Sequence, residues 1–375
     1  MSYCLNPHCS KPENPEDVKF CITCGTKLLL KERYRAIKPI GQGGFGRTFL
    51  AVDEDKPSKP SCVIKQLYPQ AQGTNTVQKA IELFNQEAIQ LDELGTHTQI
   101  PQLLAYCTQD DRQYLVQEFI DGQNLSMELS YQGNFHENQI IELIYDVLNV
   151  LQFCHSKQVI HRDIKPENII RRRSDDKLVI VDFGAAKSTI GQPINMTGTS
   201  IGSPEYVAPE QMRGKATFAS DIYSLGVTCI NLLTGRSPFD SYDTHNATWR
   251  WRQFVKTPIS NELGIIIDKM VQVIPRKRYQ NVGDIFRDLQ SLNPPTSTNI
   301  PTTIVNPPAR KQSFASQNHN QLEQELHEVK THFTGSKQQP HNPTPQTSNP
   351  LPVNKKLDVI DRELEEMKAK FLGEE

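Results

Sequence analysis

The chain has 375 residues, of which 37% are hydrophobic and 22% charged, and it contains 25 prolines and 8 cysteines. Its 41 lysines and arginines nearly balance 43 acidic residues, which gives a formal net charge of −2. This balance argues against binding to nucleic acid or to an anionic membrane surface through net charge. The length allows two or three domains of about 150 residues each.

The sequence predicts a cytoplasmic protein without a membrane span. The start, Met1-Ser2-Tyr3-Cys4, lacks the basic and then apolar segments of a secretory signal. The most apolar run, residues 222–233, fits a buried helix and is too short to cross a bilayer. In a reducing compartment, cysteines indicate metal ligands or core packing before disulfides.

Four segments differ in composition. Residues 1–28 are rich in cysteine and proline, and residues 33–292 carry the alternating strand-like and helix-like patterns of a folded domain. Residues 293–354 hold ten prolines among Asn, Gln, Ser and Thr. This stretch has too few apolar side chains to offset the entropy of ordering, so it is predicted to be a disordered linker. Residues 355–375 regain helical periodicity.

Two close pairs of cysteines mark the N-terminal segment. Cys4 and Cys9 are separated by four residues and Cys21 and Cys24 by two, with a glycine after the last. Such pairs fit the ligand spacing of a structural zinc site, and so short a segment depends on metal for its fold. The segment resembles the zinc ribbons at bacterial protein termini, which implies Zn²⁺ held by these four thiols. His8 is an alternative ligand.

Two other interpretations of the cysteine pairs stay open: a redox-active dithiol or iron–sulfur site, and thiols without a metal. Against the redox interpretation, the Cys21–Cys24 pair lacks the strand-to-helix context of a thioredoxin-like site. The remaining cysteines lie in or beside apolar runs and are predicted to be small core residues. They are Cys62, Cys107, Cys154 and Cys229.

A glycine-rich segment, Ile40-Gly41-Gln42-Gly43-Gly44-Phe45-Gly46, precedes a strand-like run that begins at Arg47. Glycines allow a tight turn and the close approach of backbone to phosphate oxygens. In a dinucleotide-binding unit the last glycine opens a helix, whereas a strand pattern follows here. The segment is therefore predicted to be a hairpin lid over nucleotide phosphates.

A lysine and a glutamate are predicted to form a buried ion pair. Lys65 ends the strand-like run Cys62-Val63-Ile64-Lys65, and Glu87 belongs to a helix predicted over residues 76–94. Glu87 shares the inward face of this helix with Phe84 and Leu91. A buried carboxylate needs a cation, and Lys65 is its natural partner.

Two motifs in the second half of the domain carry the chemistry of phosphoryl transfer. They are His161-Arg162-Asp163-Ile164-Lys165-Pro166-Glu167-Asn168 and Asp182-Phe183-Gly184, each after an apolar run. Phosphoryl transfer from a nucleotide needs an acceptor for a hydroxyl proton and oxygen ligands for Mg²⁺. The order and spacing resemble the catalytic and metal-binding loops of protein kinases. With its four-cysteine start, the chain resembles bacterial eukaryotic-type (Hanks-type) serine/threonine kinases.

The resemblance implies an α+β, two-lobed protein kinase fold over residues 33–292. A small β-rich N-lobe spans residues 33–120 and a larger helical C-lobe spans residues 121–292, preceded by a zinc ribbon and followed by a disordered tail. The resemblance also implies ATP and Mg²⁺ as cofactors and the Ser/Thr hydroxyls of proteins as substrates.

The resemblance assigns roles to single residues. Asp163 accepts or orients the proton of the substrate hydroxyl, Lys165 stabilises the transferring γ-phosphoryl group, and Lys65 contacts the α- and β-phosphates. Asn168 and Asp182 hold Mg²⁺. Lys165 also indicates the serine/threonine branch. The nucleotide-binding residues implied are Ile40, Gly41, Gln42, Gly43, Gly44, Phe45, Gly46, Thr48, Val63, Lys65, Glu87, Glu118, Ile120, Asn168 and Asp182.

The adenine site is expected beside the strand-like run 114–120. By the resemblance, the adenine edge meets the backbone carbonyl of Glu118 and the backbone N–H of Ile120. Two positions depart from the family pattern: Thr48 replaces the usual valine against the ring, and Gln117 places an amide at the position that guards the back pocket.

Further motif residues are expected to hold the site together. The resemblance places Ser203 against Asp163 and Lys165. It also pairs Glu210 with Arg278 as a structural ion pair, and Asp221 is expected to hold the backbone of the catalytic loop.

Arg162, directly before the catalytic aspartate, suggests control by phosphorylation. A guanidinium at this position is normally neutralised by a phosphate on the activation segment. The candidates are Thr197, Thr199 and Ser200, and the distance to Glu210 favours Thr199.

Two patterns allow more than one interpretation. Arg171-Arg172-Arg173 is the densest basic run and is interpreted as a solvated hairpin tip, with a docking patch as the alternative. A short heptad seam recurs in residues 355–375. Self-association or partner docking through this seam, and an unpaired amphipathic helix, both stay open. The seam residues are Leu357, Ile360, Leu364, Met367 and Phe371.

The first functional hypothesis is an active serine/threonine kinase. The alternative is a nucleotide-binding pseudokinase scaffold that recruits partners through the ribbon and the tail. The presence of every residue of the catalytic set favours the enzyme; these residues are Lys65, Glu87, Asp163, Asn168 and Asp182. A nucleic-acid-binding ribbon is a third idea, and the absence of a cationic excess in this segment argues against it.

Overall fold

The computed structural model describes residues 1–43, 46–69, 74–184, 186–188 and 203–290. Several predictions fall on residues outside these ranges: the tip of the glycine-rich segment, the candidate phosphorylation sites, the linker and the tail seam. They concern Gly44, Phe45, Thr197, Thr199, Ser200 and residues 293–354 and 355–375.

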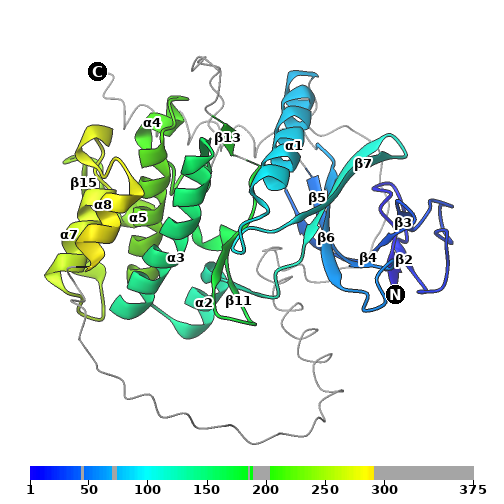
Figure 1. The fold of residues 1–375 in the computed structure, drawn as a ribbon, viewed down its shortest axis with the longest axis horizontal. Helices are drawn as coiled ribbons and strands as arrows, with labels where there is room; N and C mark the ends of the chain where they lie inside the picture. The colour runs from blue at the N-terminus through cyan, green and yellow to red at the C-terminus, as the bar shows by residue number, and fades with distance from the viewer. Residues whose placement is uncertain (44–45, 70–73, 185, 189–202, 291–375) are drawn as a thin grey trace, which may run out of the picture. The chain divides into compact units, whose positions relative to one another are not determined.

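The N-lobe is built on an antiparallel sheet (Figure 1). Its strands, in spatial order, are β3 (Leu29–Leu30), β4 (Tyr34–Gln42), β5 (Gly46–Asp53), β6 (Ser61–Leu67), β8 (Arg112–Glu118) and β7 (Leu103–Gln109). Successive side chains of a strand point to opposite faces. Phe49, Ile64 and Val116 therefore share one apolar core, whereas Leu115 belongs to a second core on the other face.

Helix α1 (Thr74–Leu94) packs against the second face through the predicted stripe. Phe84, Ala88 and Leu91 are buried in the same core as Leu115 of β8. The helix ends where the N–H of Gly95 donates to the carbonyl of Leu91. A Cβ atom at this glycine would lie 2.6 Å from the Leu91 oxygen, so glycine fits this close turn.

The C-lobe is largely helical (Figure 1). Its α-helices are α2 (Leu125–Gln132), α3 (Glu137–Ser156), α4 (Pro209–Met212), α5 (Phe218–Thr234), α6 (Pro238–Ser241), α7 (Asn261–Met270) and α8 (Val282–Gln290). Short 3₁₀ helices are η1 (Pro166–Asn168), η2 (Trp251–Phe254) and η3 (Pro275–Lys277). No helix among the described residues has the length and apolar content needed to span a bilayer.

Helix α5 is the centre of the C-lobe core, as its apolar run predicted. Every residue from Ala219 to Ile230 is buried. Thr217 and Ser220 cap its first turn reciprocally, and Gly235 ends it with a left-handed φ of 65°.

Short strands carry the motif residues of the C-lobe. β9 (Gly122–Asn124), β11 (Ile169–Arg172) and β12 (Leu178–Ile180) form a sheet in the order β12-β11-β9. Two further pairs join β10 (Val159–Ile160) with β13 (Lys187–Ser188) and β14 (Tyr242–Asp243) with β15 (Thr248–Trp249). The predicted catalytic loop thus lies between β10 and β11, and the predicted metal-binding motif follows β12.

The basic run lies in the β11–β12 hairpin, but two of its three arginines belong to strand β11 and not to the tip. Each arginine is paired with a carboxylate, which removes the cationic excess that the sequence suggested. The pairs are Arg171–Glu128, Arg172–Asp175 and Arg173–Asp121.

The cysteine-rich segment packs on the face of the N-lobe sheet that is opposite helix α1. Its strands β1 (Ser2–Tyr3) and β2 (Glu13–Asn14) pair with each other, and Leu5 is buried in the core that contains Phe49. Arg35 of β4 donates to the hydroxyl oxygen of Ser2 (3.2 Å) and to the carbonyl of Val18 (3.1 Å). The segment is therefore in direct apolar and polar contact with the kinase-like sheet.

Candidate active site

The predicted catalytic side chains meet around Asp163. Lys165 Nζ lies 3.0 Å from Asp163 Oδ2 and donates to Ser203 Oγ at 2.6 Å. The backbone N–H of Ser203 donates to Asp163 Oδ1 and the amide of Asn168 donates to Asp163 Oδ2, each at 2.9 Å. Both carboxylate oxygens are therefore held, so a substrate hydroxyl would meet an oriented proton acceptor.

The backbone of this loop is fixed by Asp221 of α5, as expected. Asp221 Oδ1 accepts the N–H of Arg162 (2.8 Å), and Oδ2 accepts the N–H of His161 (3.0 Å). Burial acts to raise the pKa of Asp221, but the hydrogen bond and charge of His155, the charge of His161 and the N–H of Arg162 together outweigh it, and the pKa is lowered. The charged carboxylate offsets the strain of Arg162, which has a φ of 71°.

The predicted ion pair of Lys65 and Glu87 is present. Lys65 Nζ pairs with Glu87 Oε1 and lies 3.3 Å from Asp182 Oδ1. The Lys65 ammonium holds the pKa of Asp182 below its usual range. Burial acts to lower the pKa of Lys65, but the two carboxylates outweigh it and raise the pKa. At neutral pH the site therefore presents a cation beside an ionised Asp182.

Asn168 and Asp182 fit a Mg²⁺ site by the chemistry of their free oxygens. Asn168 Nδ2 donates to the backbone oxygen and to Oδ2 of Asp163, and no donor within the described ranges reaches its own Oδ1. The Asp182 side chain is 49% accessible, whereas the side chain of Phe183 beside it is buried. The N–H of Val181 donates to the carbonyl of Asn168 (2.9 Å), which keeps the two ligands side by side. An amide and a carboxylate oxygen would leave positions for water and phosphate oxygens.

The glycine-rich segment forms the predicted hairpin and not a helix. β4 carries Ile40, Gly41 and Gln42 and pairs with β5, and the N–H of Gly43 donates to the carbonyl of Gly46 (2.9 Å). A Cβ atom at Gly46 would lie 2.5 Å from the backbone oxygen of Gln66, so only glycine fits there.

The predicted adenine-facing residues share one face of the sheet. Thr48 lies opposite Lys65, and Val63 lies opposite Gln117 across the strands. Val63 and Lys65 are two residues apart and therefore point to the same side. Gln117 is buried, and its amide oxygen has no hydrogen-bond partner in the described part of the chain.

The expected hinge follows β8. The N–H of Glu118 donates to the carbonyl of Gln102 (2.9 Å), which ties the end of β8 to the start of β7. The backbone N–H of Ile120 has no backbone acceptor among the residues described, so it is available to a ligand.

Arg162 and Arg278 differ in how their charges are compensated. Arg278 is buried and makes two bonds to Glu210, at 2.6 and 2.8 Å, which confirms the predicted structural pair. The Nε of Arg162 has no hydrogen-bond partner within the described ranges, and burial lowers the pKa of this residue.

The four N-terminal thiols converge. Cys4 and Cys24 Sγ are 3.5 Å apart, Cys9 and Cys21 Sγ are 3.6 Å apart, and all four sulfurs lie within 4.8 Å of one another. Four sulfurs at about 2.3 Å from a tetrahedral Zn²⁺ are about 3.8 Å apart. The arrangement therefore fits a metal of this size. His8 is not a member of the cluster, because its ring lies against Tyr68.

Polar neighbours of the thiols were not predicted. Asn14 Nδ2 lies 3.5 Å from Cys21 Sγ, and Thr26 Oγ1 lies 3.3 Å from Cys24 Sγ. Burial acts to raise the pKa of Cys24, but its hydrogen bonds with Thr26, Cys4 and Cys21 together outweigh it and lower the pKa to about 6. The short segment has no periodicity from which these contacts follow.

This geometry defines a protein kinase, and comparison with known proteins agrees. Residues 34–287 match the family model of the protein kinase domain, so the chain belongs to the protein kinase family. It resembles the bacterial serine/threonine members in particular. It is 40% identical over 299 residues to serine/threonine-protein kinase B of Synechocystis sp. (strain ATCC 27184 / PCC 6803 / Kazusa), a match that covers 77% of this chain and 52% of that protein.

Two further relatives have the same description. Serine/threonine-protein kinase PknA of Nostoc sp. (strain PCC 7120 / SAG 25.82 / UTEX 2576) is 40% identical over 269 residues, covering 70% of this chain and 48% of that protein. Serine/threonine-protein kinase PrkC of Bacillus subtilis (strain 168) is 31% identical over 272 residues, covering 69% and 40%. The chain thus spans about half the length, or less, of these curated relatives.

Proposed function

We propose that the chain is an active ATP- and Mg²⁺-dependent kinase that phosphorylates Ser or Thr hydroxyls of proteins. The observation that carries this proposal is the environment of Asp163, whose two oxygens are held by Lys165, Asn168 and the N–H of Ser203. Such an arrangement orients the acceptor for the hydroxyl proton. The closed Lys65–Glu87 pair supports the same function.

In the proposed reaction, Asn168 and Asp182 would hold Mg²⁺, which would supply positive charge to the phosphates of ATP, and ADP would be the leaving group. Lys65 binds the α- and β-phosphates. Asp163 orients the incoming hydroxyl and takes up its proton, and Lys165 compensates the charge on the transferred γ-phosphoryl group. Removal of one contact of this type costs roughly 10²–10³ in rate.

A phosphate-transfer assay tests the proposal. With radiolabelled ATP and a protein acceptor, wild type should incorporate phosphate and Asp163→Asn should lose at least about a hundredfold in rate. Asp111→Asn, at an exposed turn between β7 and β8, is the matched control and should keep the wild-type rate. Equal incorporation by wild type and Asp163→Asn would reject the enzyme and favour the pseudokinase scaffold.

We also propose that activation-segment phosphorylation controls the enzyme. A phosphate would meet the half-buried guanidinium of Arg162, whose Nε has no partner in the described residues. Thr199 is the favoured site, with Thr197 and Ser200 as the other candidates. Mass spectrometry of the active enzyme should find a phosphate on one of them. Three unmodified residues in active enzyme would contradict this control.

We propose Zn²⁺ as the resident of the cluster formed by Cys4, Cys9, Cys21 and Cys24. The sulfur spacing supports it, because it is close to that of a tetrahedral zinc site. Elemental analysis of the purified chain should find about one zinc per chain. Iron in its place would support the iron–sulfur alternative, and no metal would support free or redox-active thiols.

We also propose that the chain is cytoplasmic and that it self-associates or docks on a partner through residues 355–375. None of the eight cysteines forms a disulfide, which supports a reducing, cytoplasmic environment for this chain. The heptad seam of residues 355–375 supports self-association or docking on a partner. Light scattering of the full chain and of a chain ending at residue 354 should differ in mass if the seam self-associates. Equal masses would contradict self-association.

A further inference from the structure

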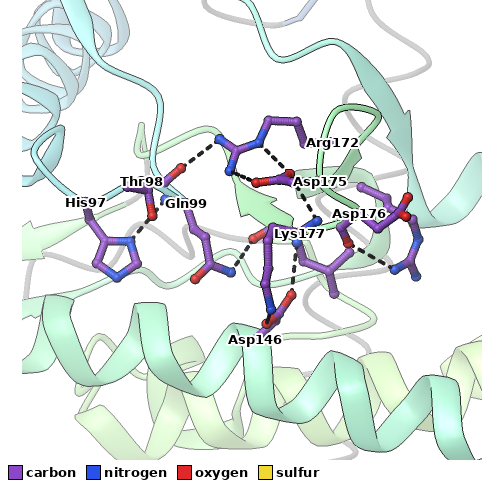
Figure 2. A network of polar contacts seen from close by, with 10 residues as sticks. His97, Thr98, Gln99, Asp146, Arg172, Asp175, Asp176 and Lys177 are labelled. Carbon is purple, nitrogen blue, oxygen red and sulfur yellow. Dashed lines mark hydrogen bonds and ion pairs between the residues drawn. The ribbon is translucent and has the colours of Figure 1, made fainter. Parts of the chain in front are cut away.

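One residue of the loop between α1 and β7, Gln99, forms hydrogen bonds with the edge of strand β12. Gln99, labelled in Figure 2, donates from Nε2 to the carbonyl of Leu178 (2.7 Å). The N–H of Ile180 donates to the carbonyl of Gln99 (3.0 Å). β12 pairs on its other side with β11, so these bonds use the edge of β12 that no strand covers in the described residues. Gln99 is 8% exposed, so both contacts are shielded from water.

Strand β12 leads directly to the metal-binding motif. Asp182 follows Ile180 by two residues, and the N–H of Val181 is already bound to the carbonyl of Asn168. A displacement of β12 at Ile180 would therefore move Asp182 relative to Asn168, the other expected Mg²⁺ ligand.

The other end of the same loop leads to the ion pair. Gly95 ends α1, and α1 carries Glu87, which binds Lys65. Lys65 in turn lies 3.3 Å from Asp182 Oδ1. Asp182 is thus connected to the α1–β7 loop in two ways. One connection runs through Lys65, Glu87 and helix α1, and the other runs through β12 to Gln99.

Two neighbours of Gln99 hold the loop at other places. His97 Nδ1 accepts the N–H of Gln99 (3.2 Å), and its ring packs on Phe153 of α3 with ring centroids 5.0 Å apart. Arg172 of β11 donates to the carbonyl of Thr98 (2.8 Å) and pairs with Asp175 (Figure 2). Of the three loop residues His97, Thr98 and Gln99, it is Gln99 whose contacts are made with β12, the strand that leads to Asp182.

We propose that Gln99 is a positioning residue for Mg²⁺ binding: it sets the place of Asp182 against Asn168 and against the Lys65–Glu87 pair. This inference rests on the proposed kinase function. Its signature is a change in the Mg²⁺ requirement, because Gln99 touches neither nucleotide nor protein substrate in the proposed reaction.

The test compares Gln99→Met with Arg172→Met in the full chain. Methionine is close in size to glutamine but cannot donate to the Leu178 carbonyl, which is left buried without its partner. Arg172→Met removes the bond to Thr98 on the same loop and the pair with Asp175, but leaves both hydrogen bonds between Gln99 and β12 in place. Binding of a fluorescent ATP analogue is titrated at increasing Mg²⁺ concentration, together with kcat and KM.

We expect Gln99→Met to raise the Mg²⁺ concentration at half-saturation by about tenfold, since misplacement of a ligand by about 1 Å is costly at such sites. Its affinity for the analogue without Mg²⁺ should match wild type, and kcat should fall more than KM rises. Arg172→Met should keep the wild-type Mg²⁺ requirement. An unchanged requirement in Gln99→Met, or an equal change in both variants, would overturn the proposal.

Two measurements keep the test decisive. If circular dichroism shows that Gln99→Met is unfolded, Gln99→Asn, which keeps the amide but is one methylene shorter, takes its place. Loss of folding in both would show a structural role only and overturn the proposal. Wild type that binds the analogue with Mg²⁺ but transfers no phosphate would contradict the proposed function, while the binding comparison would still decide the role of Gln99.

Discussion

Gln66 of β6 donates a hydrogen bond from Nε2 to the carbonyl oxygen of Leu5, 2.8 Å away. The same Nε2 lies 3.0 Å from the hydroxyl of Tyr114 on β8. Gln66 follows Lys65 directly, and the two side chains point to opposite faces of the sheet. The cysteine-rich segment is therefore one residue away, along β6, from the lysine of the nucleotide site.

Removal of the proposed Zn²⁺ should destabilise the N-lobe and not the cysteine segment alone. Leu5 is buried in the core of β4–β6, and its release would forfeit about 2 kcal/mol of apolar burial. For a domain of this size that corresponds to a fall in Tm of roughly 4–8 °C. Differential scanning calorimetry with and without a zinc chelator measures this fall in Tm, and re-addition of Zn²⁺ is the control. An unchanged N-lobe transition would show that the segment folds and docks without metal.

Glu87→Gln should reduce kcat by about 10²–10³ because Lys65 loses its ion pair with Glu87 and keeps only the one with Asp182. Glu128→Gln, a buried glutamate paired with Arg171 away from the site, is the matched control for stability. Steady-state kinetics with ATP, together with thermal unfolding of both variants, separates the two effects. A rate loss in Glu128→Gln as large as that in Glu87→Gln would assign the effect to folding.

Acid should weaken the fold partly through Asp53. Arg33 makes two bonds of 2.8 Å to this buried carboxylate and lowers its pKa. The unfolded pKa is about 3.9, so the contribution of the pair is fully present above about pH 5. It is lost as the pH falls below 4 toward the folded pKa. Urea unfolding of wild type and Asp53→Asn between about pH 3 and 6 should show a difference that shrinks on acidification. A constant difference would contradict the linkage.

Arg278→Leu should destabilise the C-lobe by about 3–5 kcal/mol, because it leaves Glu210 near-buried and without its cation. The double variant Arg278→Leu/Glu210→Leu should recover part of that loss, since no uncompensated charge remains. Urea unfolding of the single and double variants provides the comparison. A double variant less stable than Arg278→Leu would mean that other contacts of Glu210 dominate, including the one with Ser220.

Local motifs were predictable from the sequence because their chemistry is encoded in adjacent residues. The Lys65–Glu87 pair followed from a charged residue on an apolar helix face, and the buried α5 followed from an uninterrupted apolar run. The roles of Gln66 and Gln99 were not predictable. Each is a glutamine whose partners are backbone carbonyls 61 and 79 residues away, and neither periodicity nor spacing encodes such a contact.

The left-handed φ of Arg162 is compensated by a carboxylate that belongs to α5, the most buried helix of the C-lobe. The backbone at Arg162 cannot leave this strained conformation independently, because the carboxylate that holds it belongs to a helix buried in the C-lobe core. Amide protons of the catalytic loop should therefore exchange with solvent only as fast as the C-lobe itself unfolds. Asp163, the proposed proton acceptor, is thus held in place without nucleotide or substrate, and neither has to supply free energy to build its environment.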